Sequence, residues 1–151
     1  MKAELLYPEL SYQIIGCAFE VFNVLGGGHK EIAYHKACGI EFAKKSIAFN
    51  ENLYSPLIYQ DSVVEKNFFD FSVENKIVVE LKSRDRFIKR DFEQLSNYLN
   101  NSNLKLGILI AFGRTDVKFK RVLNIELLNR EKNNLDTNYK SVTNITDEKQ
   151  S

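Results

Sequence analysis

The sequence predicts one α/β domain with a mixed central β-sheet flanked by helices, in the order α-α-β-β-β-α-β-β. Three observations support this fold class. Residues 8–25 repeat apolar side chains at helical spacing, whereas residues 67–83 alternate with the period of two that strands show. Residues 106–112 form a near-continuous apolar run, which is typical of a strand buried on both faces. A chain of 151 residues is long enough for one domain with a substantial core.

Two helices are expected first. Pro8 suits the first turn of a helix over residues 8–25, and the glycine run at residues 26–28 ends that helix. The glycines lack a Gly-Lys-Ser/Thr ending and follow no strand, so we interpret them as a hinge between helices and not as a phosphate loop. A second helix is expected over residues 29–46.

Strands follow over residues 47–59 and 63–73, with Pro56 marking an edge or a bend because proline cannot donate to a central sheet. The second of these strands enters a hairpin over residues 67–83. An amphipathic helix is then expected over residues 88–100. The buried strand at 106–112 and a last strand at 117–124 complete the predicted sheet.

The register of the hairpin can be predicted from parity. A three-residue turn at residues 74–76 pairs Val73 with Ile77 and Asp70 with Glu80, whereas a two-residue turn would mix apolar with polar positions. The odd turn groups the apolar side chains on one face, namely Phe69, Phe71, Val73, Ile77, Val79 and Leu81. We therefore expect Asp70, Glu80 and Lys82 to converge on the opposite face.

This cluster suits a hard cation. Two neighbouring carboxylates repel unless a proton or a cation lies between them, and oxygen ligands favour Mg²⁺ or Mn²⁺. A lysine beside them can orient a water or stabilise charge on a transferring phosphoryl group. The alternative is a solvated face on which Lys82 only pairs with Glu80, since 27% of the residues are charged.

Three segments resemble a known superfamily. The pattern Asp70…Glu80-Leu81-Lys82 resembles the signature of the PD-(D/E)XK nucleases. The segment GHKEIAY at residues 28–34 resembles the motif of the GxxExxY family, a compact branch of that superfamily. The segment QLSNY at residues 94–98 is similar to the Q-x-x-x-Y helix of RecB-like members. The order and spacing of the three segments, over residues 7–124, also resemble this superfamily. The resemblance implies a restriction-endonuclease-like core.

The resemblance also implies roles for single residues. Asp70, Glu80 and the Leu81 carbonyl would bind Mg²⁺ or Mn²⁺, and Glu31 would add an acidic ligand from a helix. Lys82 would position or help to deprotonate the attacking water. The expected catalytic residues are therefore Glu31, Asp70, Glu80 and Lys82.

Substrate contacts are expected from five residues in three places. Tyr34 would pack beside Glu31 with its hydroxyl toward a carboxylate or a phosphate. Gln94 and Tyr98 share one helix face and would orient the substrate if that face looks onto the polar side of the sheet. Arg84 and Arg86 follow Lys82 in a basic segment that suits phosphate contacts, with a merely solubilising loop as the alternative.

His35 lies one helical turn after Glu31. We interpret it as a surface histidine, with a place at the site as the alternative.

Composition excludes several classes of protein. A net charge of +1 means that any contact with nucleic acid must come from a local patch. Two cysteines and two histidines exclude an iron–sulfur cluster and a multi-histidine metal site within one chain. We interpret Cys17 and Cys38 as reduced, buried thiols of a cytoplasmic protein, and we expect neither a signal peptide nor a membrane span.

We expect a single nuclease-like domain over residues 1–129 and a polar, flexible C-terminal tail over residues 130–151. The expected activity is hydrolysis of phosphodiester bonds in DNA, with RNA as the less favoured substrate. Two alternatives stay open: a nucleic-acid-binding protein on the same fold without turnover, and a protein-interaction module with ordinary surface ion pairs. A homodimer and a further protein partner also stay open, because no residue specifies either.

Overall fold

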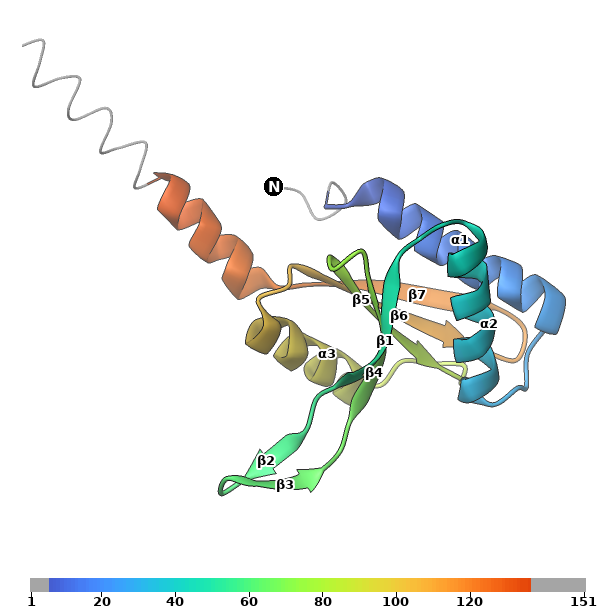
Figure 1. Cartoon of the computed structure of the whole chain (residues 1–151), viewed down its shortest axis with the longest axis horizontal. Coiled ribbons are helices and arrows are strands. Elements are labelled where there is room, and N and C mark those ends of the chain that lie inside the picture. Colours follow the sequence, from blue (N-terminus) through green and yellow to red (C-terminus); the bar gives the residue numbers. More distant parts are fainter. Residues whose placement is uncertain (1–5, 137–151) are drawn as a thin grey trace, which may run out of the picture.

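The computed structural model describes residues 6–136 and has a central sheet with helices on both faces (Figure 1). The strand order is β1-β4-β5-β6-β7, and only β5 and β6 run parallel to each other. The strands of this sheet are β1 (Phe49–Tyr54), β4 (Phe68–Val73), β5 (Ile77–Lys82), β6 (Leu106–Phe112) and β7 (Val117–Leu123). The predicted α/β class with a mixed central sheet is therefore confirmed.

Three helices cover the sheet: α1 (Pro8–Leu25), α2 (Glu31–Lys44) and α3 (Lys89–Ser102). Gly26 ends α1 with a φ of 70° and donates its N–H to the Phe22 carbonyl at 2.7 Å. Such positive φ angles favour glycine, which explains why the chain turns here between the helices. Among the described residues, no helix is long and apolar enough to cross a membrane.

The two faces of the sheet bury different helices. Side chains of α1 and α2, among them Ile14 and Phe42, pack with Val79 on one face. On the other face, Leu95 and Leu99 of α3 pack with Leu109. Every residue of β6 is buried, as predicted for a strand covered on both sides.

The central hairpin adopts the register that parity predicts as far as the pair Phe71–Val79, and its ladder does not extend to the predicted pair Asp70–Glu80. Val73 lies opposite Ile77 and Phe71 lies opposite Val79, across the turn at residues 74–76. Glu74 and Asn75 in that turn have φ angles of 53° and 55°. The odd loop therefore places Ile77, Val79 and Leu81 together in the core under α1 and α2.

The prediction that Phe69 lies on the same face as Phe71 and Val79 is wrong. Phe69 belongs to the cluster under α3, where its ring lies 4.7 Å from that of Tyr98. The cause is an irregularity in β1: Asn52, between the pairs Glu51–Phe71 and Leu53–Phe69, has a φ of 57°. The regular alternation of side chains is interrupted at this point, next to Asp70.

Each of the strands predicted over residues 47–59 and 63–73 breaks into two. Beyond the break lie β2 (Leu57–Tyr59) and β3 (Ser62–Glu65), which form a separate two-stranded sheet. This pair projects from the body of the molecule in Figure 1. We call residues 55–67 the arm; its base is closed by the Ser55 N–H, which donates to the Asn67 carbonyl at 2.7 Å.

A further helix covers residues 125–136. Asn124 precedes it, and the Asn124 side-chain amide donates to the Leu99 carbonyl at 3.1 Å and to the Leu104 carbonyl at 3.0 Å. Residues 130–136, which the sequence assigns to the tail, are thus helical. The rest of the predicted tail, residues 137–151, lies outside the described residues.

Candidate active site

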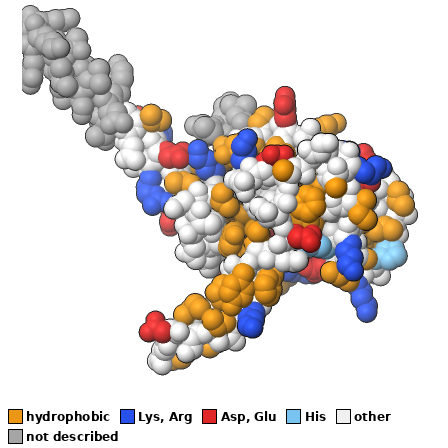
Figure 2. Space-filling view, viewed as in Figure 1, with side chains coloured by type: hydrophobic (Ala, Val, Ile, Leu, Met, Phe, Trp, Pro, Cys, Tyr) orange, Lys and Arg blue, Asp and Glu red, His pale blue; other side chains and the backbone are white. Residues whose placement is uncertain are grey.

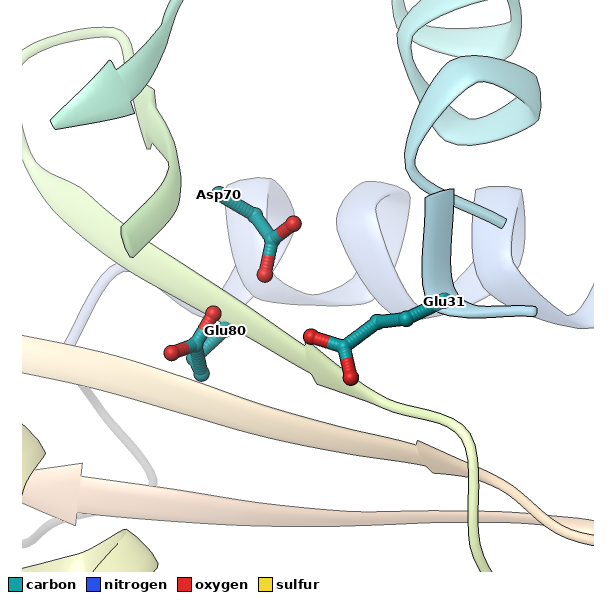
Figure 3. A group of neighbouring side chains, drawn as sticks. All are labelled: Glu31, Asp70 and Glu80. Atoms are coloured by element: carbon teal, nitrogen blue, oxygen red, sulfur yellow. The ribbon is translucent and has the colours of Figure 1, made fainter. Parts of the chain in front are cut away.

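Three carboxylates from three elements converge at one end of the sheet (Figure 3). Glu31 begins α2, Asp70 lies in β4 and Glu80 lies in β5. One oxygen from each residue lies within 4.8 Å of the other two. The glycine turn at residues 26–28 lies between α1 and α2. The chain therefore changes direction just before Glu31, which begins α2.

Burial and mutual repulsion dominate the electrostatics of this carboxylate cluster, Glu31, Asp70 and Glu80. Glu80 is 8% exposed. Burial, followed by the neighbouring Asp70, raises the pKa of Glu80 to about 10, and the charge of Lys82 only partly opposes this. The pKa of Glu31 is also raised, first by desolvation of its carboxylate. Burial and the neighbouring carboxylates therefore favour the protonated form of Glu80 in the metal-free protein.

Asp70 is held by two hydrogen bonds. One oxygen accepts the Leu81 backbone N–H at 2.8 Å, and the other lies 2.6 Å from Nδ1 of His35, which donates to it. Nε2 of His35 lies 3.3 Å from a Glu51 carboxylate oxygen. Leu81, whose carbonyl is an expected ligand, thus contacts the site through its N–H.

The interpretation of His35 as a surface residue is wrong. The side chain is buried, and its ring stacks on Phe71 with 4.5 Å between ring centroids. The face of α2 that follows Glu31 by one turn packs against the sheet, so His35 faces Asp70 and Glu51 instead of solvent. The sequence signal for His35 near the carboxylates is its spacing of four residues from Glu31, which places both side chains on one side of the helix.

Lys82 and α3 extend the site into a groove. The Lys82 Nζ lies 4.0 Å from a Glu80 carboxylate oxygen. A groove of about 620 Å³ is lined by Glu31, Glu80 and Lys82, and also by Gln94 and Tyr98 of α3. Gln94 and Tyr98 of α3 thus line the same groove as Glu31 and Glu80, and their contact with substrate stays a prediction.

Tyr34 is placed in the core and not in the groove. Its side chain is fully buried, its hydroxyl donates to the Gly26 carbonyl at 2.6 Å, and its ring stacks on Phe112 at 4.2 Å. Through these contacts Tyr34 fixes the glycine turn, and the turn in its place fixes the start of α2.

Of the two arginines in the basic segment, Arg84 differs from the expectation. The guanidinium of Arg84 binds both carboxylate oxygens of Asp91, at 2.5 and 2.6 Å. Asp91 is buried at the start of α3 and accepts the Ile88 N–H at 2.9 Å. Arg84 is therefore engaged in fixing α3, whereas Arg86 is exposed.

The groove continues from the carboxylate cluster to the arm. Pro56, Leu57 and Asn67 of the arm line it opposite α3. Figure 2 shows hydrophobic side chains gathered on the arm. Glu31 and Glu80 of the cluster thus share one groove with residues of α3 and of the arm.

Comparisons with protein families and with solved structures both found similar proteins. The family model described as PD-(D/E)XK nuclease superfamily matches residues 8–122. A solved structure described as "Crystal structure of SSO0001" is 13% identical, with a TM-score of 0.41, and the match covers 85% of this chain and 86% of that chain. A search of curated proteins found no match.

Proposed function

This chain belongs to the PD-(D/E)XK nuclease superfamily, and we propose that it is a metal-dependent nuclease that hydrolyses phosphodiester bonds of DNA. The observation that carries the proposal is the convergence of Glu31, Asp70 and Glu80 within 4.8 Å, next to Lys82. The segment at residues 28–34, which contains Glu31, supports a place in the GxxExxY branch. Two buried free thiols, Cys17 and Cys38, support a cytoplasmic protein.

The residues present fit a divalent cation. All three donors are carboxylates, which suits Mg²⁺ or Mn²⁺. The pKa of Glu80 is raised first by burial and then by Asp70, and a bound cation would oppose both effects by favouring the ionised carboxylate. Asp70, Glu80 and Glu31 would hold the ion, and the Leu81 carbonyl is a further ligand by family resemblance. A bound ion would supply Lewis-acid stabilisation of phosphate charge and acidify a water.

The remaining residues act on substrate and water. Lys82 would hold the attacking water or a phosphate oxygen, because its ammonium lies beside the carboxylate cluster. Gln94 and Tyr98 would orient the nucleic acid along the groove. Arg86, exposed near the same end of the sheet, is the remaining candidate of the basic segment for a phosphate contact.

A cleavage assay tests the proposal. Purified protein is incubated with single- and double-stranded DNA and RNA in Mg²⁺, Mn²⁺ or EDTA, beside Glu80→Ala and Lys82→Ala. We expect cleavage of DNA that needs the metal and falls by about 100-fold or more in each variant. Lys89→Ala serves as the control, since that side chain is 90% exposed on α3.

Two results would contradict the proposal. If no substrate is cut under any condition, the chain is a binding or interaction module on the nuclease fold. If Glu80→Ala cuts as fast as the unmodified protein, the reaction takes place elsewhere.

A further inference from the structure

We propose that the groove beside the carboxylate cluster binds unpaired nucleobases, so that the substrate is single-stranded DNA or a single-stranded stretch at a junction. This inference rests on the proposed function for the reaction, but it concerns binding and can be tested without cleavage. The chemistry of the two walls, the charge of the groove and the arm each support it.

The wall made by α3 is rich in side-chain amides. Gln94, Asn97, Asn100 and Asn101 all line the groove, and Asn67 adds another amide from the arm. Each amide offers both donors and an acceptor, which is the pattern needed to pair with the edges of bases. Bases offer those edges only where they are not paired with a second strand.

Aromatic rings stand beside these amides. Phe68, at the foot of the arm, lines the groove and is 52% exposed. Tyr54 lies 5.3 Å from it and is exposed as well, and Tyr98 lines the opposite wall. An exposed ring next to hydrogen-bonding amides is the arrangement on which proteins stack the bases of single strands.

The charge of the groove argues against a duplex held by its phosphates. Among the described residues that line it, the cations are Lys82 and Arg90. Lys82 lies 4.0 Å from the Glu80 carboxylate, and a guanidinium nitrogen of Arg90 lies 3.7 Å from the Glu65 carboxylate of the arm. Duplex binding depends on many basic contacts to the backbone, and this groove does not offer them.

The arm continues the aromatic and apolar wall away from the carboxylates. It exposes Leu57, Ile58, Tyr59, Val63 and Val64, each by 47% or more. Leu57 lines the groove itself, so the apolar surface and the groove are continuous. This continuity favours a strand that leaves the groove along the arm over a second copy of the chain that covers the arm.

The test is binding of fluorescent DNA in EDTA, which prevents metal-dependent cleavage. Fluorescence anisotropy is measured for a single strand and for the matched duplex with the unmodified protein, Phe68→Leu and Phe68→Tyr. The control is Tyr12→Leu, which changes an aromatic residue that is 81% exposed on α1. Thermal unfolding of each variant confirms that it is folded.

We expect the single strand to bind more tightly than the duplex. Phe68→Leu keeps an apolar side chain but loses the ring, so it should weaken single-strand binding by about 5-fold or more. Phe68→Tyr and Tyr12→Leu should bind like the unmodified protein. With two cations in the groove, the slope of log K against log salt should be no steeper than about −1.4.

Three results would overturn the inference. The first is duplex binding as tight as single-strand binding, and the second is an unchanged affinity in Phe68→Leu. The third is a dimer, detected by sedimentation, that is held together by the arm and binds no DNA. Metal-dependent cutting of duplexes without preference for single strands would overturn this inference alone. Single-strand binding in EDTA without cutting in Mg²⁺ or Mn²⁺ would overturn only the proposed reaction.

Discussion

At the scale of single residues, the Glu80 carboxyl group determines how the site responds to pH. Its pKa is raised from 4.5 to about 10, first by burial and then by Asp70. The folded protein therefore keeps a proton that the unfolded chain has already lost, at every pH between these two values. In the metal-free protein, the free energy of unfolding should fall as pH rises through this window, by up to about 1.4 kcal/mol per pH unit.

Thermal unfolding in EDTA between about pH 5 and pH 9 measures this dependence. Glu80→Gln is neutral at every pH, so its Tm should fall less with pH than the Tm of the unmodified protein. Glu93→Gln changes an exposed carboxylate of the same groove and should follow the unmodified protein. Equal slopes for Glu80→Gln and the unmodified protein would show that another group holds the proton.

Residue-scale prediction from the sequence succeeds where spacing alone determines contact. The odd turn of the hairpin sets the pairs Val73–Ile77 and Phe71–Val79, and Asp70 and Glu80, which follow those pairs in β4 and β5, offer oxygens within 4.8 Å of each other. The prediction for His35 fails because its burial depends on which face of α2 packs on β1 and β4, and helical periodicity does not specify the partner. The pairing of Arg84 with Asp91 could not be predicted, because Asp91 lies in the next element and no sequence pattern relates the two residues.

At the scale of elements, the pair Arg84–Asp91 connects the end of β5 to the start of α3. Arg84→Ala leaves the buried Asp91 carboxylate without its cation, and we expect a loss of about 1–3 kcal/mol in the free energy of unfolding. Denaturation in urea measures this loss. Arg86→Ala changes an exposed neighbour and should cost less than about 0.5 kcal/mol. Similar losses in the two variants would contradict a structural role specific to Arg84.

The turn between α1 and α2 allows a second test. A Cβ atom added to Gly27 would lie 2.4 Å from the Arg114 carbonyl oxygen and 2.6 Å from the Gly113 carbonyl oxygen. Because both atoms belong to the backbone, Gly27→Ala must push the turn away from the β6–β7 connection, at a cost of roughly 1–3 kcal/mol. The turn leads into Glu31, so the substitution should also weaken metal binding.

Gly16→Ala is the matched control for this test. Nothing lies within 4 Å of a Cβ atom added at Gly16, in the interior of α1. There alanine should raise the free energy of unfolding by about 0.5–1 kcal/mol. Urea denaturation of both variants compares them, and a Gly27→Ala variant as stable as the unmodified protein would contradict the close approach.

Helices and sheet strands are predictable to within a few residues because their periodicities are strong. The bounds of α1 and β6 match the prediction, and α2 and α3 differ by one or two residues at each end. The breaks that create the arm are less visible. Pro56 signals the first break, at residues 55–56, whereas the second break, at residues 66–67, contains neither proline nor glycine.

At the scale of the whole molecule, the superfamily and the sheet are predictable, whereas the groove is not. Motif order and strand patterns predict that Glu31, Asp70 and Glu80 belong to one site. The groove forms where the base of the arm comes near α3, so that Asn67 and Phe68 line the same groove as Asn97 and Asn101. How near the arm lies to α3 depends on tertiary packing. The periodicity of a single segment does not encode that packing.

Metal binding and folding should also be coupled across the whole molecule. A cation that binds the folded chain alone raises the free energy of unfolding by about 2.7 kcal/mol at a concentration of 100 Kd. Binding must displace the proton of Glu80, so affinity should increase with pH. The cation would thereby remove the destabilisation that the metal-free protein suffers at high pH.

The measurement that tests the central claim most directly is calorimetric titration of the metal-free protein with Mn²⁺ at pH 6 and pH 8. We predict saturable binding, tighter at pH 8, that Asp70→Asn abolishes and that Glu9→Gln, a change at an exposed site on α1, leaves intact. No binding by the unmodified protein, or equal binding by Asp70→Asn, would contradict a metal site built from Glu31, Asp70 and Glu80.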